Sequence, residues 1–189
     1  MLDYEEESSH KGIRWAMDKR RLVIWLTVFI ASWYGMMLMH ELGHCLGALV
    51  CGADIDAVVI PLFGFSRTDV SGGSSPLLVV WAGPIAGAIL PLGMMVLVRR
   101  MGRCLQHAIL FFCGFCLVAN GAYVGIGSVS AAGDCRQMLH LGSPVWLLVV
   151  FGVIAAAAGL YAWHRMGAVS SWFDGKQIAD WEGEADQKI

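Results

Sequence analysis

Four long apolar segments constrain the fold of this chain more than any other feature of its sequence. They cover about residues 22–49, 77–98, 105–127 and 145–163, and each is long enough to cross the hydrocarbon core of a bilayer as a helix. The chain is 57% hydrophobic and only 15% charged, so little of it remains for a sizeable soluble domain. We therefore expect an all-α membrane protein with about four transmembrane helices.

The distribution of basic residues predicts the orientation of these helices. Only Arg67 and Arg136 fall in the loops after the first and third segments. Cytoplasmic loops carry an excess of lysine and arginine, so both termini are expected in the cytoplasm, in an integral multi-pass protein of a plasma (inner) membrane. The other basic residues that flank the segments are Lys11, Arg14, Lys19, Arg20, Arg21, Arg99, Arg100, Arg103 and Arg165.

The same segments predict the domain organisation. Within the core, residues 53–76 are too short and too broken by Pro61 and Gly64 to span a membrane, and their β-branched and aromatic residues favour a short re-entrant loop or β-hairpin. Irregular backbone at membrane depth is tolerated only against protein or a water-filled cavity, so this loop predicts water beside the first helix. The predicted parts are a cytoplasmic or interfacial N-terminal segment (1–21), a core of three spans (22–141), a fourth transmembrane helix (142–165) and a polar C-terminal tail (166–189).

The first apolar segment contains a group of ionisable residues that matches the pattern H-E-x-x-H. On a helix, His40 and His44 project from one face and can share one metal ion. Glu41 lies on the flank of that face, where its carboxylate can reach a metal-bound water without binding the metal. Such patterns arise by chance, but ionisable residues inside a membrane are costly and usually functional. The pattern therefore predicts a hydrolytic zinc site with two histidine ligands and Glu41 as general base.

A catalytic zinc site needs a third protein ligand and an open position for water. Asp134 follows the third apolar segment, where a helix that ends near the same membrane face could direct a carboxylate at the two histidines. Asp134 is therefore the expected third ligand. The alternative is that it serves as the N-cap of a short helix over residues 135–141. Weaker ligand candidates are Asp54, Asp56, Asp69 and His140.

Small residues predict where the helices approach one another. Gly83 and Gly87 form a G-x-x-x-G pattern at the start of the second segment, which favours close contact with the motif helix. Four glycines and two serines in residues 120–135 favour a third helix that loosens towards its end. Cys113 and Cys116 match C-x-x-C, but inside an apolar helix they are expected to pack as small polarisable side chains.

Together these stretches resemble the site-2 protease family of intramembrane zinc metalloproteases. The resemblance rests on residues 40–48 followed by Gly52, on the broken loop with Pro61, and on the Ala-Gly-Pro-Ile-Ala-Gly sequence of residues 82–87. It covers roughly residues 22–141. It implies a three-helix catalytic core and one zinc ion (Zn²⁺) per chain. By position, His40, His44 and Asp134 would be the metal ligands, Glu41 the catalytic base and Asn120 a residue that binds substrate or the oxyanion.

The resemblance also implies a function. The chain would be a zinc metalloendopeptidase that hydrolyses a peptide bond of a membrane-anchored protein substrate, as in regulated intramembrane proteolysis. Its partners would be that substrate and the lipid bilayer, with no nucleic acid. An extended substrate segment could pair with the edge of residues 57–70. The family usually has an Asn and a Pro shortly before an Asp-Gly pair, whereas Cys135 follows Asp134 here, so the alternative is a catalytically degenerate member that acts as a membrane regulator or metal-handling protein.

Overall fold

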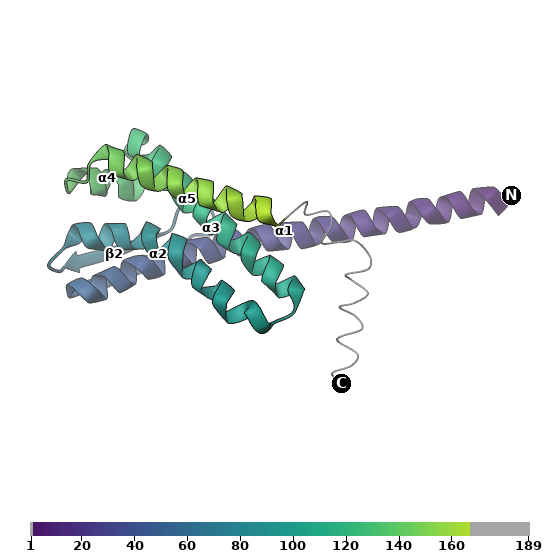
Figure 1. Ribbon diagram of the computed structural model, residues 1–189, viewed down its shortest axis with the longest axis horizontal. Coiled ribbons are helices and arrows are strands. Elements are labelled where there is room, and N and C mark those ends of the chain that lie inside the picture. Colours follow the sequence, from purple (N-terminus) through teal and green to yellow (C-terminus); the bar gives the residue numbers. More distant parts are fainter. Residues whose placement is uncertain (1, 167–189) are drawn as a thin grey trace. The chain divides into compact units, whose positions relative to one another are not determined.

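The computed structural model describes residues 2–166, and these residues are mostly helical (Figure 1). Four helical stretches, residues 22–51, 76–100, 105–130 and 145–165, are long and apolar enough to cross a membrane, which confirms the expected fold class. Beyond residue 166, the predicted polar tail lies outside the described residues. The elements in chain order are α1 (Leu2–Cys51), β1 (Ala53–Val59), β2 (Arg67–Gly72), α2 (Pro76–Leu97), the 3₁₀ helix η1 (Val98–Arg100), α3 (Arg103–Ser130), α4 (Gly133–His140) and α5 (Val145–Arg165).

The chain divides into two compact units. In the first of them the structure describes residues 2–31, the N-terminal part of α1. The predicted interfacial segment is helical from Leu2, and its place at a membrane surface stays a prediction. The other unit, Ser32–Ala168, contains the remaining elements and every residue of the site described below.

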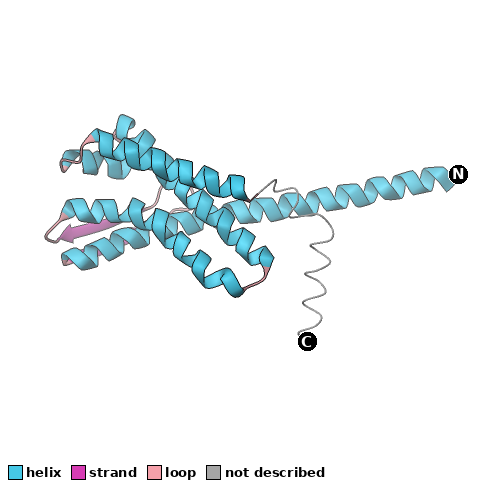
Figure 2. Ribbon diagram, in the orientation of Figure 1, coloured by secondary structure: helices cyan, strands magenta, loops and turns pink. Residues whose placement is uncertain are grey.

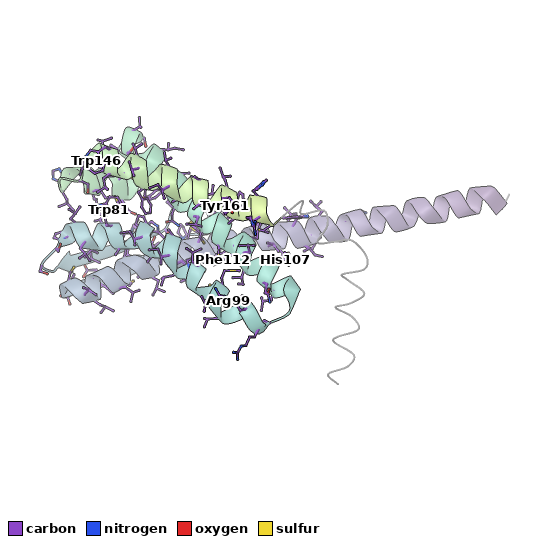
Figure 3. All side chains as sticks on the ribbon, viewed as in Figure 1. Trp81, Arg99, His107, Phe112, Trp146 and Tyr161 are labelled. Carbon is purple, nitrogen blue, oxygen red and sulfur yellow. The ribbon has the colours of Figure 1, made fainter. Side chains whose placement is uncertain are left out.

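Large apolar side chains remain exposed along the candidate spans. Leu49 and Val50 at the end of α1 are 68% and 78% exposed. Figure 3 labels Trp146 and Tyr161 on α5, which are 65% and 63% exposed. About 22 Å of helix separates these two aromatic residues, so they can lie near the two interfaces of a bilayer. A surface of this kind suits contact with lipid, as expected of a multi-pass membrane protein.

The loop after the first helix is a β-hairpin, and Figure 2 shows strand from it in magenta. Gly52 has a φ of +64°, a left-handed conformation that ends α1 and turns the chain into β1. The two strands are antiparallel, with Ala53 opposite Gly72 at one end and Val59 opposite Arg67 at the other. Of the two forms expected for this loop, the chain adopts the hairpin, and it lies at the same end of the bundle as α4 (Figure 1).

The end of α3 does not loosen. The helix continues to Ser130. A Cβ atom at Gly121 or Gly125 would lie against Gly152 of the neighbouring helix α5. Glycine allows two helix backbones to approach closely inside a membrane. The predicted loosening is wrong because these glycines provide a tight contact between helices.

A buried apolar cluster joins α2, α3, α4 and α5 and so fixes the position of α4. Trp81 of α2 adds a polar contact, because its Nε1–H donates to Ser143 Oγ at 2.8 Å in the loop after α4. These contacts hold the helix that carries Asp134 against the bundle. The buried members of the cluster are Val80, Val124, Cys135, Met138 and Leu148.

The C-x-x-C pair of α3 lies inside the bundle. Cys113 and Cys116 are fully buried. The Cys113 thiol donates to the carbonyl oxygen of Pro91 in α2 at 2.9 Å. Both cysteines are therefore packing residues, as their apolar surroundings in the sequence predict.

Candidate metal centre

Two side chains of α1 and one of α4 converge at the end of the bundle that carries the hairpin. Nε2 of His40 and Nε2 of His44 lie 3.1 Å apart. Asp134 Oδ2 lies 2.9 Å from the first of these nitrogens and 3.2 Å from the second. His40 and His44 are 7% and 6% exposed, so both imidazoles are buried. The structure thus brings together the three residues predicted as metal ligands.

The partners of the other ring nitrogens decide which form each histidine adopts. His44 Nδ1 lies 2.9 Å from the carbonyl oxygen of Val79, which can only accept, so Nδ1 carries the proton. His40 Nδ1 lies 2.8 Å from Asn120 Oδ1, whose amide nitrogen donates to the carbonyl oxygen of Cys116. This second bond makes Oδ1 the acceptor for a proton on His40 Nδ1. In both neutral imidazoles, the Nε2 lone pair therefore points towards Asp134.

Three acceptors that face one another in a buried site need a positive charge among them, which a metal ion supplies or, in the metal-free protein, a proton on one imidazole that donates to Asp134. Two Nε2 lone pairs and one carboxylate oxygen lie within 3.2 Å of each other, with no donor among them when both histidines are neutral. Ligand atoms arranged tetrahedrally at zinc bond lengths lie roughly 3.3 Å apart, close to these separations. Protonation of both imidazoles would place two positive charges side by side in a buried site, which is costly. The donor set therefore fits a divalent metal ion.

A hydrogen bond from its backbone fixes Asp134, the third candidate ligand. Asp134 lies in the first turn of α4, and its backbone N–H donates to the hydroxyl oxygen of Tyr123 at 3.0 Å. Burial raises the pKa of the Asp134 carboxyl group, but in the metal-free protein the hydrogen bonds and positive charge of a protonated imidazole at His40 or His44 hold that pKa below its ordinary value. The N-cap interpretation is wrong, because Ala132 occupies that position and the Asp134 side chain turns to the histidines.

The predicted general base lies beside the triad and is not part of it. Glu41 is only 1% exposed. Its Oε2 accepts a 2.6 Å hydrogen bond from the hydroxyl of Thr68 in β2. Within the described part of the chain, Oε1 has no hydrogen-bond partner. A buried carboxylate oxygen left without a partner next to a metal site is a natural acceptor for a proton from water.

Asn120 lies behind His40. It is 1% exposed, and both polar atoms of its amide bond to protein groups. Partners of this kind fix the orientation of a metal-binding histidine and raise its basicity. The structure therefore supports Asn120 as a partner of a ligand, and its contact with substrate stays a prediction.

The weaker ligand candidates do not join the site. In the part of the chain that the structure describes, His40, His44 and Asp134 form the one group of three potential ligands that could hold a metal. Asp56 accepts a hydrogen bond from Ser71, and Asp69 lies 3.3 Å from Arg67 Nε. The exposed candidates are Asp54, Asp56, Asp69 and His140.

Two glycines of α2 make room for the centre, and the predicted contact between α2 and the motif helix is present. A Cβ atom at Gly83 would overlap the imidazole of His44, and a Cβ atom at Gly87 would overlap the amide of Asn120. On the motif helix, a Cβ atom at Gly43 would in turn overlap the backbone of Ala82. The small residues of α2 therefore leave space for the side chains of the metal centre and also allow close helix packing.

We expect Gly83→Ala to displace the His44 ring and so to lower Zn²⁺ affinity. The decrease should be at least about 10-fold, which is the smallest effect typical of losing a residue that orients a metal ligand. Competition titration with a chelating dye measures this affinity. Gly93→Ala in the same helix is the matched control, because a Cβ there meets nothing within 4 Å. Equal affinities in the two variants would contradict the placement of His44 against α2.

Three contacts at the centre were not foreseen from the sequence. The carbonyl of Val79 is a backbone group, and Thr68 is one hydroxyl in a polar strand, so no residue pattern marks either. Tyr123 is different, because it lies three residues after Asn120 on the same face of α3. Helical spacing from Asn120 would have found it.

Comparison of the chain with protein-family models, curated proteins and solved structures finds no match. The case for a metal centre therefore rests on the chain's own geometry. That geometry is a buried pair of histidines whose Nδ1 atoms each meet a protein oxygen, an aspartate that faces both Nε2 atoms, and a separate buried glutamate.

Proposed function

We propose that the chain is a zinc-dependent intramembrane endopeptidase of the site-2 protease type, which hydrolyses a peptide bond of a membrane-anchored protein. The observation that carries this proposal is the arrangement of His40, His44 and Asp134 around one point, with Glu41 buried beside them and not among them. Three ligands and a separate carboxylate are the parts that metal-assisted hydrolysis requires.

The donor set favours zinc among the common divalent metals. Two imidazoles and one carboxylate suit a tetrahedral ion and leave the fourth position for water. Bound there, zinc would polarise the peptide carbonyl and lower the pKa of its water to about 7. Asn120 and the Val79 carbonyl keep both Nε2 atoms directed at the ion, so the ligands are ordered before the metal arrives.

Glu41 carries the proton transfers in this proposal. Its free Oε1 takes a proton from the attacking water and passes it to the leaving amine when the peptide bond breaks. Burial excludes bulk water from the carboxylate, which strengthens its interactions with the reacting groups.

The hairpin offers a means of holding the substrate. A peptide bond within a transmembrane helix is shielded by the helix's own hydrogen bonds, so the substrate must unwind locally before water can attack. The sheet has two strands, β1 and β2, and among the described residues each has an outer edge without a strand partner. An extended substrate segment added to one edge would regain backbone hydrogen bonds that lipid cannot supply.

Metal analysis and proteolysis of the purified protein in lipid vesicles test the proposal together. We expect about one zinc per chain, matching the candidate site of the described residues. We also expect cleavage of at least one member of a library of single-span reporter proteins. Removal of zinc with 1,10-phenanthroline should stop cleavage, and added Zn²⁺ should restore it. Zinc binding without cleavage would favour a metal-handling or regulatory protein, and absence of zinc would contradict the metal centre.

A further inference from the structure

One hydroxyl of the hairpin reaches the candidate catalytic base. Thr68 Oγ1 donates to Glu41 Oε2 at 2.6 Å, a short hydrogen bond to a charged acceptor. Thr68 is half-buried, whereas the other residues of β2 are exposed. Because Glu41 is buried, loss of its one hydrogen bond within the described chain would leave a carboxylate without compensation for lost water.

The strand geometry explains why this residue, and not a neighbour, meets Glu41. Successive side chains of a strand point to opposite faces. Arg67 and Asp69 therefore lie on the face opposite Thr68, where they approach each other at 3.3 Å and are exposed. Pairing with Val58 of β1 fixes the register that directs the Thr68 hydroxyl towards α1.

We propose, on the basis of the function proposed above, that Thr68 is a positioning residue for the catalytic base. By holding Oε2, its hydroxyl orients the carboxylate of Glu41 so that Oε1 remains for the proton of the attacking water. A glutamate side chain without this bond can rotate about its terminal torsion and exchange the two oxygens. The hydroxyl of Thr68 thus gives the two chemically equal oxygens of Glu41 different roles.

The location of Thr68 links base orientation to substrate docking. A substrate segment that adds to the hairpin would pair with β1 or β2. These strands form the sheet whose Thr68 hydroxyl holds Glu41. The hairpin would therefore position both the substrate segment and the catalytic base Glu41. An extended chain docked in the correct register keeps the hydroxyl directed at Glu41, so the hairpin aligns the scissile bond with the group that activates water.

The test compares Thr68→Val, which keeps the side-chain shape but removes the donor, with Thr68→Ser, which keeps the donor. Thr68→Val should lower kcat by about 10-fold to 100-fold with KM unchanged, because only orientation of the base is lost. Thr68→Ser should recover most of kcat. Ser71→Ala is the matched control, because it removes another hydroxyl-to-carboxylate bond from the same strand, at the exposed Asp56.

A second measurement does not depend on cleavage. The carboxylate stretching bands of Glu41, isolated in infrared difference spectra against Glu41→Gln, should shift in metal-free Thr68→Val and not in Thr68→Ser or Ser71→Ala. Unshifted bands, or a rise in KM with kcat unchanged, would overturn the inference while leaving the proteolytic function in place. If the bands shift in Thr68→Val but the wild-type protein cleaves no reporter, the proposed function is overturned, and the catalytic role of Thr68 with it.

Discussion

Glu41→Gln is expected to abolish cleavage while the metal site stays intact. Glutamine has almost the same shape as glutamate but cannot accept a proton from water at neutral pH, so kcat should fall by at least about 100-fold. Glu41 lies outside the triad, and zinc content should therefore remain at the wild-type level. Cleavage of the reporter proteins in vesicles and metal analysis of the same preparation measure the two quantities.

Asp69→Asn is the matched control for this variant. It also converts a carboxylate to an amide, but Asp69 is an exposed residue of β2 whose partner is Arg67. It should leave both cleavage and zinc content unchanged. If Glu41→Gln retained cleavage, Glu41 could not be the base. If a cellular phenotype were unchanged by Glu41→Gln but lost on deletion of a span, the chain would act as a regulator and not as a protease.

The sequence predicts the spans and the α1 part of the site because local rules determine both. A long apolar segment in a membrane satisfies its backbone polar groups by forming a helix, whatever its neighbours. The four-residue spacing of His40 and His44 places them on one face of that helix. The structure accordingly agrees with the number of apolar helices and with the shared face of the two histidines.

Contacts between distant segments were harder to predict. The position of Asp134 followed from the expected end of the third helix, and the structure places its carboxylate at the two histidines. The role of Val79 could not be foreseen, since any residue offers the same carbonyl. Thr68 required the hairpin register, which depends on pairing between β1 and β2 and includes an irregularity between Ile55 and Ala57.

The glycines of α3 show why the prediction of a loosened helix end, which rested on composition alone, was wrong. Glycine weakens a helix in water because it adds backbone freedom to the unfolded chain. Inside a bundle, Gly121 and Gly125 instead allow α5 to approach through Gly152, and this close packing of two backbones outweighs the entropic cost of ordering glycine. Which effect dominates depends on whether another helix lies alongside, and the sequence of one helix does not contain that information.

Asp134→Asn is expected to remove zinc binding without unfolding the bundle. The variant retains the backbone N–H that donates to Tyr123, and its amide can donate to the Nε2 lone pairs of His40 and His44. The protein without metal should therefore stay folded, with a melting temperature somewhat below that of the wild type because the ionised carboxylate beside the two imidazoles is lost. Loss of a residue that only orients a metal ligand lowers metal affinity by up to about 100-fold. Loss of the charged ligand itself should lower zinc affinity by more than that.

Thermal unfolding with and without Zn²⁺ separates metal binding from folding. A ligand present at 100 times its Kd stabilises the folded state by about 2.7 kcal/mol, so Zn²⁺ should raise the melting temperature of the wild type and not that of Asp134→Asn. Asp56→Asn, an exposed hairpin variant, should respond to Zn²⁺ as the wild type does. A zinc-dependent rise in Asp134→Asn equal to that of the wild type would show that the third ligand lies elsewhere. Because Asp134 is the one carboxylate of the described residues that lies within 3.2 Å of both Nε2 atoms, that result would also require the hairpin or α4 to rearrange on binding metal.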